Sequence, residues 1–469
     1  QPIYHIYYEY VYNLGRKSST RALEMVDRNP PKLDATEKYE ANTATSKDLF
    51  EEATEVLPGG TGGSAPNYDP YPFFISKAEG ADVWDVDGNE YIDFNLSWGV
   101  LAVGHQHPML IEGLQDRQRE GTMYGLPHEE TLEVARSLRK RFPIEKVRFT
   151  NSGTESTLYA TRLARRVTNN DKIVKIEGGY HGVSDQLHMS KRPPLQKAGH
   201  PDRPTSVPYG NGIPEGVVKN TINAPFNDIK AMDDILSNHL GEVAAIIVEP
   251  VMMNAGVIPP QDGYLQDLRK LTEEHNTLLI FDETKTGVKI APGGAADYYN
   301  VEPDLITLAK AIGGGLPIGA IGGKASIMDE IGNEGLFGTF SANPLSIRAS
   351  KITLTEILTN AEYEEMERLG AVLFSGYEDI IEDYELDATV QSVNGVGGPI
   401  FTKNPVFNYR EWAAVDHEVF HEYWLNMVNE GIIPTSYGAD EEANLCVQHT
   451  EEDIQQHLEA FKVTASRLS

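Results

Sequence analysis

The stretch Leu305–Gly323, LITLAKAIGGGLPIGAIGG, decides the fold of this chain. Its apolar start predicts a β-strand over Leu305–Leu308, which is followed by a lysine, Lys310, and then by a run of glycines. Earlier in the chain, the apolar run Leu278–Asp282 predicts another strand, and this strand ends in a carboxylate. Carboxyl ends of neighbouring parallel strands meet at one edge of a sheet. We therefore expect Lys310 and Asp282 to converge on one ligand.

A lysine and a carboxylate in this arrangement match the needs of pyridoxal 5'-phosphate (PLP). A lysine holds the cofactor aldehyde as a Schiff base, and an acid beside the pyridine nitrogen keeps it protonated. Lys310 could instead be a solvated surface lysine, but its apolar and glycine-rich flanks favour a shielded position. We predict that Lys310 is the nucleophile and proton carrier, and that Asp282 pairs with the ring nitrogen. No metal site is predicted.

A phosphate-binding turn is expected at NSGTE, residues 151–155, between a strand over Lys146–Thr150 and a helix over Glu155–Val167. Small residues at the start of a helix let backbone N–H groups approach an anion, and the helix dipole favours its charge. The alternative is an ordinary helix N-cap. The candidate phosphate ligands are Ser152, Gly153 and Thr154.

Four further side chains are candidates for the same site. Tyr180, between glycines in GGYHG, could lie flat on a heteroaromatic ring, whereas we assign its neighbour His181 no catalytic role. Glu249 ends the apolar run AAIIV, and Thr284 follows Asp282 by two positions, where it could contact a ring face. Further along, the hydroxyl-rich turn at residues 338–344 places Thr339 near its centre.

The middle of the chain alternates strands with helices, which indicates a mainly parallel sheet covered by helices. Beyond residue 345 the pattern predicts a long helical stretch over Ser346–Leu369 and then mixed strand and helix. We expect an N-terminal segment over 1–95 (an arm, a helix and short strands, part of the small domain), a large cofactor-binding domain over 96–345, and a smaller α+β domain over 346–469. The clearer strands are expected at Lys146–Thr150, Lys172–Ile176, Val243–Glu249, Leu278–Asp282, Leu305–Leu308 and Ile318–Gly322.

Composition narrows the possible functions. The chain has 469 residues with 70 acidic and 40 basic side chains, which gives a formal net charge of -30. Such a charge repels nucleic acid and anionic membranes, so neither is expected as a partner. The acidity fits either a salt-rich cytoplasm or simply an acidic soluble enzyme.

Cys446 is the single cysteine, so no internal disulfide is possible. The tyrosine-rich start lacks the basic beginning and apolar centre of a signal peptide, and we expect a cytoplasmic location.

In order and spacing, these motifs resemble the class III aminotransferases of PLP fold type I. The shared motifs are NSGTE at 151–155, GGYHG at 178–182, VEP at 248–250, FDE at 281–283, LAKAIGGGLPIGA at 308–320 and GTFSANPLS at 338–346. Within that family the chain is most similar to the glutamate-1-semialdehyde 2,1-aminomutase group and related β-amino acid transaminases. The motifs behind this are LPGG at 57–60, VWDVDGNEYIDF at 83–94, SWG at 97–99, RFTNSGTE at 148–155 and HTEEDI at 449–454.

The resemblance implies an α/β fold with a mainly parallel seven-stranded sheet and a homodimer with its active sites at the interface. It implies that Lys310 forms the internal aldimine with PLP, that Tyr180 stacks on the ring, and that Thr339 reaches the phosphate of the neighbouring subunit. Two departures concern the substrate. The segment Thr61–Tyr68 has no arginine to bind a substrate carboxylate, and the stretch at 282–289 reads DETKTGVK, where the family usually has DEVxTGFR.

The main function predicted is a PLP-dependent aminotransferase that moves an amino group from an amine or amino acid to a keto acid or other carbonyl acceptor. The alternative is glutamate-1-semialdehyde 2,1-aminomutase, which transfers the amino group within one substrate, and a third is a non-catalytic PLP-binding protein. Because the arginine is missing, we favour donors that lack a carboxylate near the reacting carbon and carry an apolar group facing Tyr68 and Trp98. The alternatives are that another cation holds the carboxylate or that an arginine from elsewhere in the chain reaches it.

Overall fold

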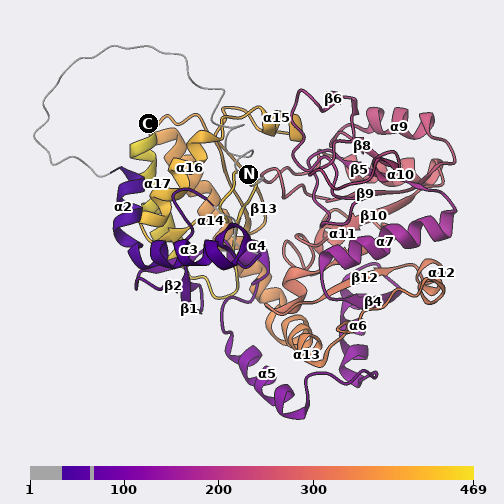
Figure 1. Ribbon diagram of the computed structural model, residues 1–469, viewed down its shortest axis with the longest axis horizontal. Coiled ribbons are helices and arrows are strands. Elements are labelled where there is room, and N and C mark those ends of the chain that lie inside the picture. Colours follow the sequence, from indigo (N-terminus) through magenta and orange to yellow (C-terminus); the bar gives the residue numbers. More distant parts are fainter. Residues whose placement is uncertain (1–33, 64–67) are drawn as a thin grey trace, which may run out of the picture. The chain divides into compact units, whose positions relative to one another are not determined.

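The computed structural model describes residues 34–63 and 68–469 (Figure 1). The tyrosine-rich start and residues 64–67 of the arginine-free segment lie outside this described part. The chain forms two compact units, one ending at residue 77 and taking up residues 84–90, the other made of residues 78–83 and 91–469. The predicted three-part division at residues 95 and 345 stays a prediction. None of the described helices is long and apolar enough to cross a membrane.

The first unit is mainly helical. Helices α2 (Ala35–Asn42) and α3 (Ala44–Val56) are followed by a short 3-10 turn at Pro58–Gly60. Strands β1 (Ile75–Glu79) and β2 (Asp82–Asp85) run through the boundary between the units, and β3 (Glu90–Asp93) follows them.

The second unit is built on the predicted α/β sheet, which has seven strands. β10 pairs in parallel with β9 and β11, and β5 pairs in parallel with β9 and β8. β12 runs antiparallel to both of its neighbours, β11 and β4. The mainly parallel sheet is therefore confirmed. In spatial order the strands are β4 (Lys146–Thr150), β12 (Gly319–Gly323), β11 (Leu305–Leu308), β10 (Leu278–Asp282), β9 (Val243–Val248), β5 (Lys172–Ile176) and β8 (Thr221–Ala224).

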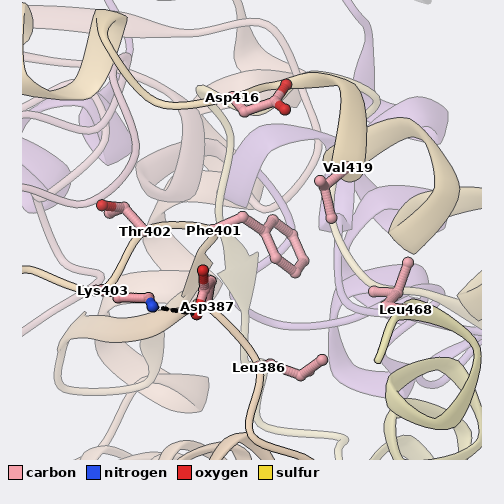
Figure 2. Close-up of a pocket in the computed structure, with 8 residues that line it drawn as sticks. All are labelled: Leu386, Asp387, Phe401, Thr402, Lys403, Asp416, Val419 and Leu468. Carbon is pink, nitrogen blue, oxygen red and sulfur yellow. Dashed lines mark ion pairs between the residues drawn. The ribbon is translucent and has the colours of Figure 1, made fainter. Parts of the chain in front are cut away.

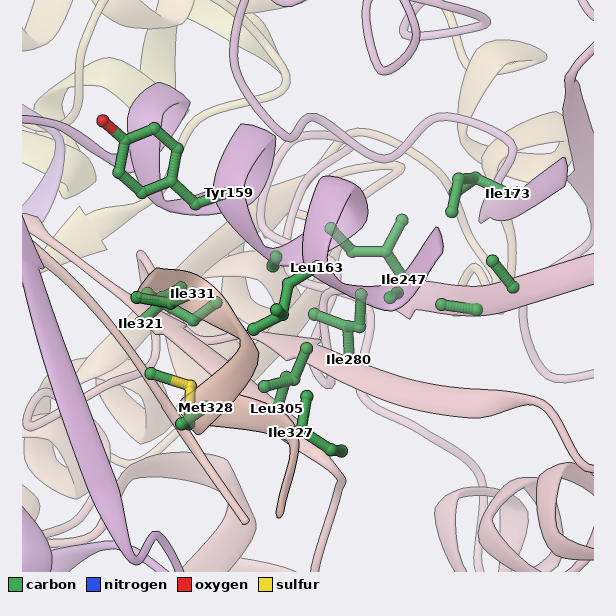
Figure 3. Close-up of a cluster of buried hydrophobic side chains, with 14 of the residues drawn as sticks. Tyr159, Leu163, Ile173, Ile247, Ile280, Leu305, Ile321, Ile327, Met328 and Ile331 are labelled. Atoms are coloured by element: carbon green, nitrogen blue, oxygen red, sulfur yellow. The ribbon is translucent and has the colours of Figure 1, made fainter. Parts of the chain in front are cut away.

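Helices lie along this sheet. Helix α7 (Gly153–Thr168) contacts β9, β11 and β12, while α9 (Ile229–Asn238) lies along β8 and α10 (Tyr264–Glu274) along β10 (Figure 1). Figure 3 shows the core between α7 and the sheet, where Leu163 of the helix points toward Ile280 and Leu305 of the strands. All three of these side chains are fully buried. Burial of such side chains stabilises the fold by about 1.5–3 kcal/mol each and holds α7 against the sheet.

One edge of the sheet collects the chemically active residues. Strands β4, β5, β9, β10 and β11 run in the same direction, so their carboxyl ends lie on one side. The residues at these ends carry the predicted site. β11 leads into Lys310, β10 ends at Asp282, β9 precedes Glu249, β5 precedes the Tyr180 turn, and β4 precedes Ser152.

The predicted helical stretch over Ser346–Leu369 is interrupted rather than continuous. The chain forms α13 (Pro344–Ile352), a π-helical turn (Thr353–Ile357) and, after a break, α14 (Asn360–Asp383). Leu358 leaves the helical conformation with ψ of 74°, and Thr359 caps α14 by accepting a hydrogen bond from Glu362 N at 3.5 Å. The sequence pattern Thr-x-x-Glu is typical of a helix start and could have predicted this break.

The rest of the chain combines short strands with helices. β13 (Thr389–Val393) pairs with β14 (Val396–Ile400), which pairs with β16 (Ala443–Asn444). β15 (Ile432–Ile433) pairs in parallel with β3. The remaining longer helices are α5 (Pro108–Glu120), α6 (Glu129–Arg141), α16 (Glu418–Asn429) and α17 (Glu451–Leu468).

Candidate active site

A cavity of about 360 Å³ opens at the carboxyl edge of the sheet. Eight of the predicted site residues line it together, although they lie at or after the ends of five different strands. These are Ser152, Gly153, Thr154, Tyr180, Glu249, Asp282, Thr284 and Lys310. The structure therefore brings together the predicted phosphate, ring and lysine groups. The cavity is also lined by Asn254 and Lys285, which sequence reasoning did not place there.

Lys310 begins a 3-10 turn that runs to Gly313 directly after β11. Its φ of 50° lies in the left-handed region, which is costly for a residue with a Cβ and is often found at functional sites. Burial, together with the nearby charge of Lys285, lowers the pKa of Lys310 to about 8. The amine is thus far easier to deprotonate than a lysine in water, as a nucleophile or a base requires.

Asp282 is held by three hydrogen bonds. It accepts from Thr307 Oγ1 at 2.9 Å and from Thr284 N at 3.1 Å, and His181 Nδ1 lies 2.8 Å from its Oδ2. Burial alone would raise the pKa of Asp282, but the hydrogen bond and charge of His181 hold it below its usual range. Asp282 is therefore kept as a carboxylate, the form that can pair with a protonated ring nitrogen.

His181 was given no catalytic role from the sequence, and the structure places it behind Asp282. Its ring is buried, its backbone oxygen accepts from Thr157 Oγ1 at 2.7 Å, and its Nε2 has no hydrogen-bond partner among the described residues. His181 is thus a positioning residue for Asp282. The spacing between His181 and Asp282 along the chain gives no signal for this contact, so only the fold reveals it.

The turn after β4 is a helix cap whose first N–H groups can also bind an anion. Ser152 is the N-cap of α7, since its side chain accepts from Glu155 N at 3.2 Å. The first turn of a helix presents N–H groups without partners inside the helix, and these bind anions. Gly153 leaves the necessary room, because a Cβ there would lie 3.1 Å from the Thr284 side chain. The two interpretations of this turn are therefore compatible.

Glu249 orders the loop that carries Tyr180. One carboxylate oxygen accepts from Tyr180 N at 2.7 Å, and the other accepts from Asn254 Nδ2 at 2.7 Å and from Met253 N at 3.2 Å. Lys191 Nζ lies 4.7 Å from the centre of the Tyr180 ring and covers one of its faces. The ring also lines the cavity, so Tyr180 is held at the position predicted for a stacking side chain.

Lys285 forms a buried ionic cluster on the cavity wall. Its Nζ lies 2.8 Å from Glu441 Oε2 and 3.0 Å from Glu442 Oε2, and it donates to Met253 O. Burial alone would lower the pKa of Lys285, but the two carboxylates raise it above its ordinary value. Burial raises the pKa of Glu442 to about 7. Lys285 therefore stays charged beside Lys310.

Three predicted residues are not in the cavity wall of the single chain. Thr339 is exposed, and Trp98 is half-buried with its N bonded to Asn95 Oδ1 at 3.0 Å. Tyr68 lies in the first unit, where it is buried and its hydroxyl is 3.2 Å from the hydroxyl of Tyr39. The roles of Tyr68 and Trp98 in a substrate pocket, and of Thr339 at a neighbouring phosphate, stay predictions.

A second hollow lies near the C-terminus, away from the sheet edge. Figure 2 shows Phe401 and Leu468 on its wall, and an ion pair of 3.1 Å joins Lys403 to Asp387. Both members of this pair are exposed. None of the predicted site residues lines this hollow.

PLP fits the first cavity. Thr284 Oγ1 is buried there without a hydrogen-bond partner among the described residues, and the room at Gly153 suits a close approach of an anion. The α7 turn would hold the phosphate, Asp282 the ring nitrogen and Lys310 the aldehyde. In the described part of the chain, no group of three or more His, Cys, Asp or Glu side chains could hold a metal.

Known proteins resemble the chain over most of its length. The glutamate-1-semialdehyde 2,1-aminomutase of Methanothermobacter thermautotrophicus is 42% identical over 428 residues, which cover 90% of this chain and 99% of that protein. An ω-transaminase structure from Sphaerobacter thermophilus has a TM-score of 0.85 at 30% identity, covering 90% of this chain and 97% of the other. A Pseudomonas aeruginosa glutamate-1-semialdehyde aminomutase structure has a TM-score of 0.85 at 26% identity, covering 93% and 97%.

The sheet, the lysine after β11 and the acid at the end of β10 define a PLP-dependent enzyme of fold type I. Residues 63–463 match the aminotransferase class-III family, so the chain belongs to it. The resemblance stated from the motifs is confirmed, as are the PLP cofactor and the aminotransferase class.

Proposed function

We propose that the protein is a glutamate-1-semialdehyde 2,1-aminomutase, which moves an amino group between two carbons of one substrate. The observation that carries the proposal is the likeness to aminomutases such as that of M. thermautotrophicus over nearly their whole length. A second relative, named glutamate-1-semialdehyde 2,1-aminomutase 2, from Brevibacillus brevis, is 40% identical over 97% of its length. These names support the alternative raised from the sequence more than a general intermolecular aminotransferase.

The residues around the cavity suit this chemistry. Bound PLP supplies an electron-withdrawing ring that stabilises negative charge on the substrate carbon next to nitrogen. Lys310 Nζ is the base that removes a proton from one substrate carbon and returns it to another, because its lowered pKa leaves a useful share of neutral amine near pH 8. Asp282 keeps the ring nitrogen protonated, and His181 keeps Asp282 ionised and oriented.

The direct test supplies PLP-loaded protein with glutamate-1-semialdehyde alone. An aminomutase converts many equivalents of this substrate per active site without any second amino or carbonyl compound. Lys310→Ala serves as the control, and its turnover should collapse because both nucleophile and base are lost. Conversion that stops at about one equivalent per site would refute the proposal.

An intermolecular aminotransferase is the second candidate, and a specific observation favours it. No arginine lines the cavity in the described part of the chain, and none occurs between Thr61 and Tyr68. The likeness to an ω-transaminase structure supports the same candidate. Rates for an aryl-alkyl amine, a β-amino acid and glutamate semialdehyde, each tested with and without pyruvate, separate the two functions. Efficient turnover of the amine only with pyruvate would favour the aminotransferase.

We also propose that the active form is a homodimer in which Thr339 serves the neighbouring site. In the single chain, Thr339 is exposed between two apolar side chains, Phe337 and Phe340, which are 74% and 65% exposed. Exposed aromatic side chains are costly in water, and a second subunit would cover them. This supports an interface at the turn that carries Thr339.

A further inference from the structure

We propose that Lys285 binds the substrate carboxylate, and that it does so by exchanging the Glu441 carboxylate for that of the substrate. The proposal rests on the proposed function, whose substrate carries a carboxylate away from the reacting carbons. The expectation drawn from the missing arginine concerned a carboxylate near the reacting carbon, whereas Lys285 would bind the distant one. Lys285 occupies the unspecified position x of the family stretch DEVxTGFR.

Elimination among the cavity residues leads to Lys285. In the described part of the chain, the wall contains three side chains that can be cationic, namely His181, Lys285 and Lys310. His181 is bound to Asp282, and Lys310 is needed for the cofactor and for proton transfer. A carboxylate shielded from water requires a cationic or hydrogen-bonding partner. Lys285 is the cation of this wall that has no other catalytic task.

The cluster around Lys285 carries more carboxylate than the lysine neutralises. Glu441 and Glu442 both contact the same ammonium. Their two negative charges are therefore held close together and repel each other. All three N–H donors of the ammonium are engaged, by these carboxylates and by Met253 O. A substrate carboxylate must therefore replace a partner rather than add to the set.

Glu441 is the partner that can leave. Its side chain is 11% exposed, whereas that of Glu442 is 2% exposed. Glu441 can turn toward water, where its charge is solvated, while Glu442 remains fixed on Lys285. After the exchange, the ammonium again contacts two carboxylates, so the charge balance of the wall is unchanged. A neutral substrate end gains nothing from this exchange.

A second pair of cations nearby is a weaker candidate. Lys191 covers the Tyr180 ring and lies 4.0 Å from Asp440, and Arg192 is ion-paired to the same carboxylate. Neither of them lines the cavity. Lys191 therefore offers a matched comparison, because it is a half-buried lysine in the same ionic surroundings but outside the wall.

The test uses calorimetry to measure how tightly the PLP-loaded protein binds two analogues, one charged and one uncharged. Pentanoate has the five-carbon length of glutamate semialdehyde and a carboxylate, and pentanamide has the same shape without the charge. We expect wild-type protein to prefer pentanoate by about tenfold or more. Lys285→Met should reduce this preference to about one, and Lys285→Arg should restore most of it. Glu441→Gln should tighten pentanoate binding several-fold, because the competing charge is removed.

Each result decides the proposal. If Lys285→Met does not fold, Lys285→Arg and Glu441→Gln still test the exchange, and weaker pentanoate binding in Glu441→Gln would overturn it. A preference that survives Lys285→Met, or that is lost in Lys191→Met instead, would also overturn it, as would equal binding of both analogues by wild-type protein. The assay needs no turnover. If pentanoate binding depends on Lys285 but glutamate semialdehyde is not converted, the proposed function fails and the carboxylate site stands.

Discussion

Lys310 is set by its surroundings to react near neutral pH. Burial and the Lys285 charge move its pKa from 10.5 to about 8, and only the neutral amine can attack the cofactor aldehyde. We expect the rate at which apoprotein takes up PLP, followed by absorbance, to rise about tenfold per pH unit below 8 and to level off above it. Lys285→Met should move the midpoint upward. A rate that keeps rising to pH 10 in the wild type would contradict this environment.

Asp282 can be tested against a matched aspartate at the opposite edge of the sheet. Asp282→Asn should keep the fold and reduce kcat by about 100-fold, because the ring nitrogen loses its anionic partner. Asp304 directly precedes β11 and is ion-paired with Arg269 and Lys324, at 2.8 and 2.6 Å. Asp304→Asn should lower the melting temperature with kcat unchanged. Near-normal turnover in a well-folded Asp282→Asn protein would refute the assigned role.

The positions of single residues could be predicted where a residue lies at the end of a strand or just after it. Lys310, Asp282 and Glu249 each follow an apolar run, and parallel pairing alone brings them together. Contacts between distant segments could not be predicted. Lys285 meets Glu441 and Glu442 across more than 150 residues of chain, and each looks like a surface charge in the sequence. The pairing of His181 with Asp282 was missed for the same reason.

At the scale of elements, α7 links the core to the cavity. Its buried face packs on the sheet, while its first turn is the one proposed to hold the phosphate. Leu163→Ala should cost about 2–5 kcal/mol of unfolding free energy, because a fully buried side chain leaves a cavity. Leu240→Ala is the control, since Leu240 is 71% exposed, and should change stability by less than about 0.5 kcal/mol. Equal effects in denaturant unfolding would mean that α7 does not pack as described.

The elements themselves were predictable in proportion to their apolar patterns. The strand Val243–Val248 is a continuous apolar run, and all six of its residues are buried. Strand β8 was missed because its sequence, Thr-Ile-Asn-Ala, alternates polar and apolar residues and is short. The break between α13 and α14 was missed because apolar residues continue through it, although Thr359 and Glu362 carry a capping pattern.

At the scale of the whole molecule, the homodimer can be tested by mixing two inactive variants. Lys310→Ala removes the lysine of one site, and Thr339→Glu places a negative charge beside the phosphate of the partner's site. If Thr339 acts across the interface, a mixed dimer has one intact site, and an equal mixture should regain about a quarter of wild-type activity. If Thr339 acts within its own chain, no mixed dimer has an intact site, and mixing restores nothing.

The most direct measurement of the central claim, that Lys310 is the residue on which the cofactor chemistry depends, is chemical labelling of the PLP-loaded protein. Borohydride reduces the bond between the cofactor aldehyde and its lysine, and peptide mapping then identifies the modified residue. We predict that the pyridoxyl group is found on Lys310, and that Lys310→Ala still binds PLP through its phosphate but takes up no label. A label on Lys285, or on any other lysine, would contradict the account.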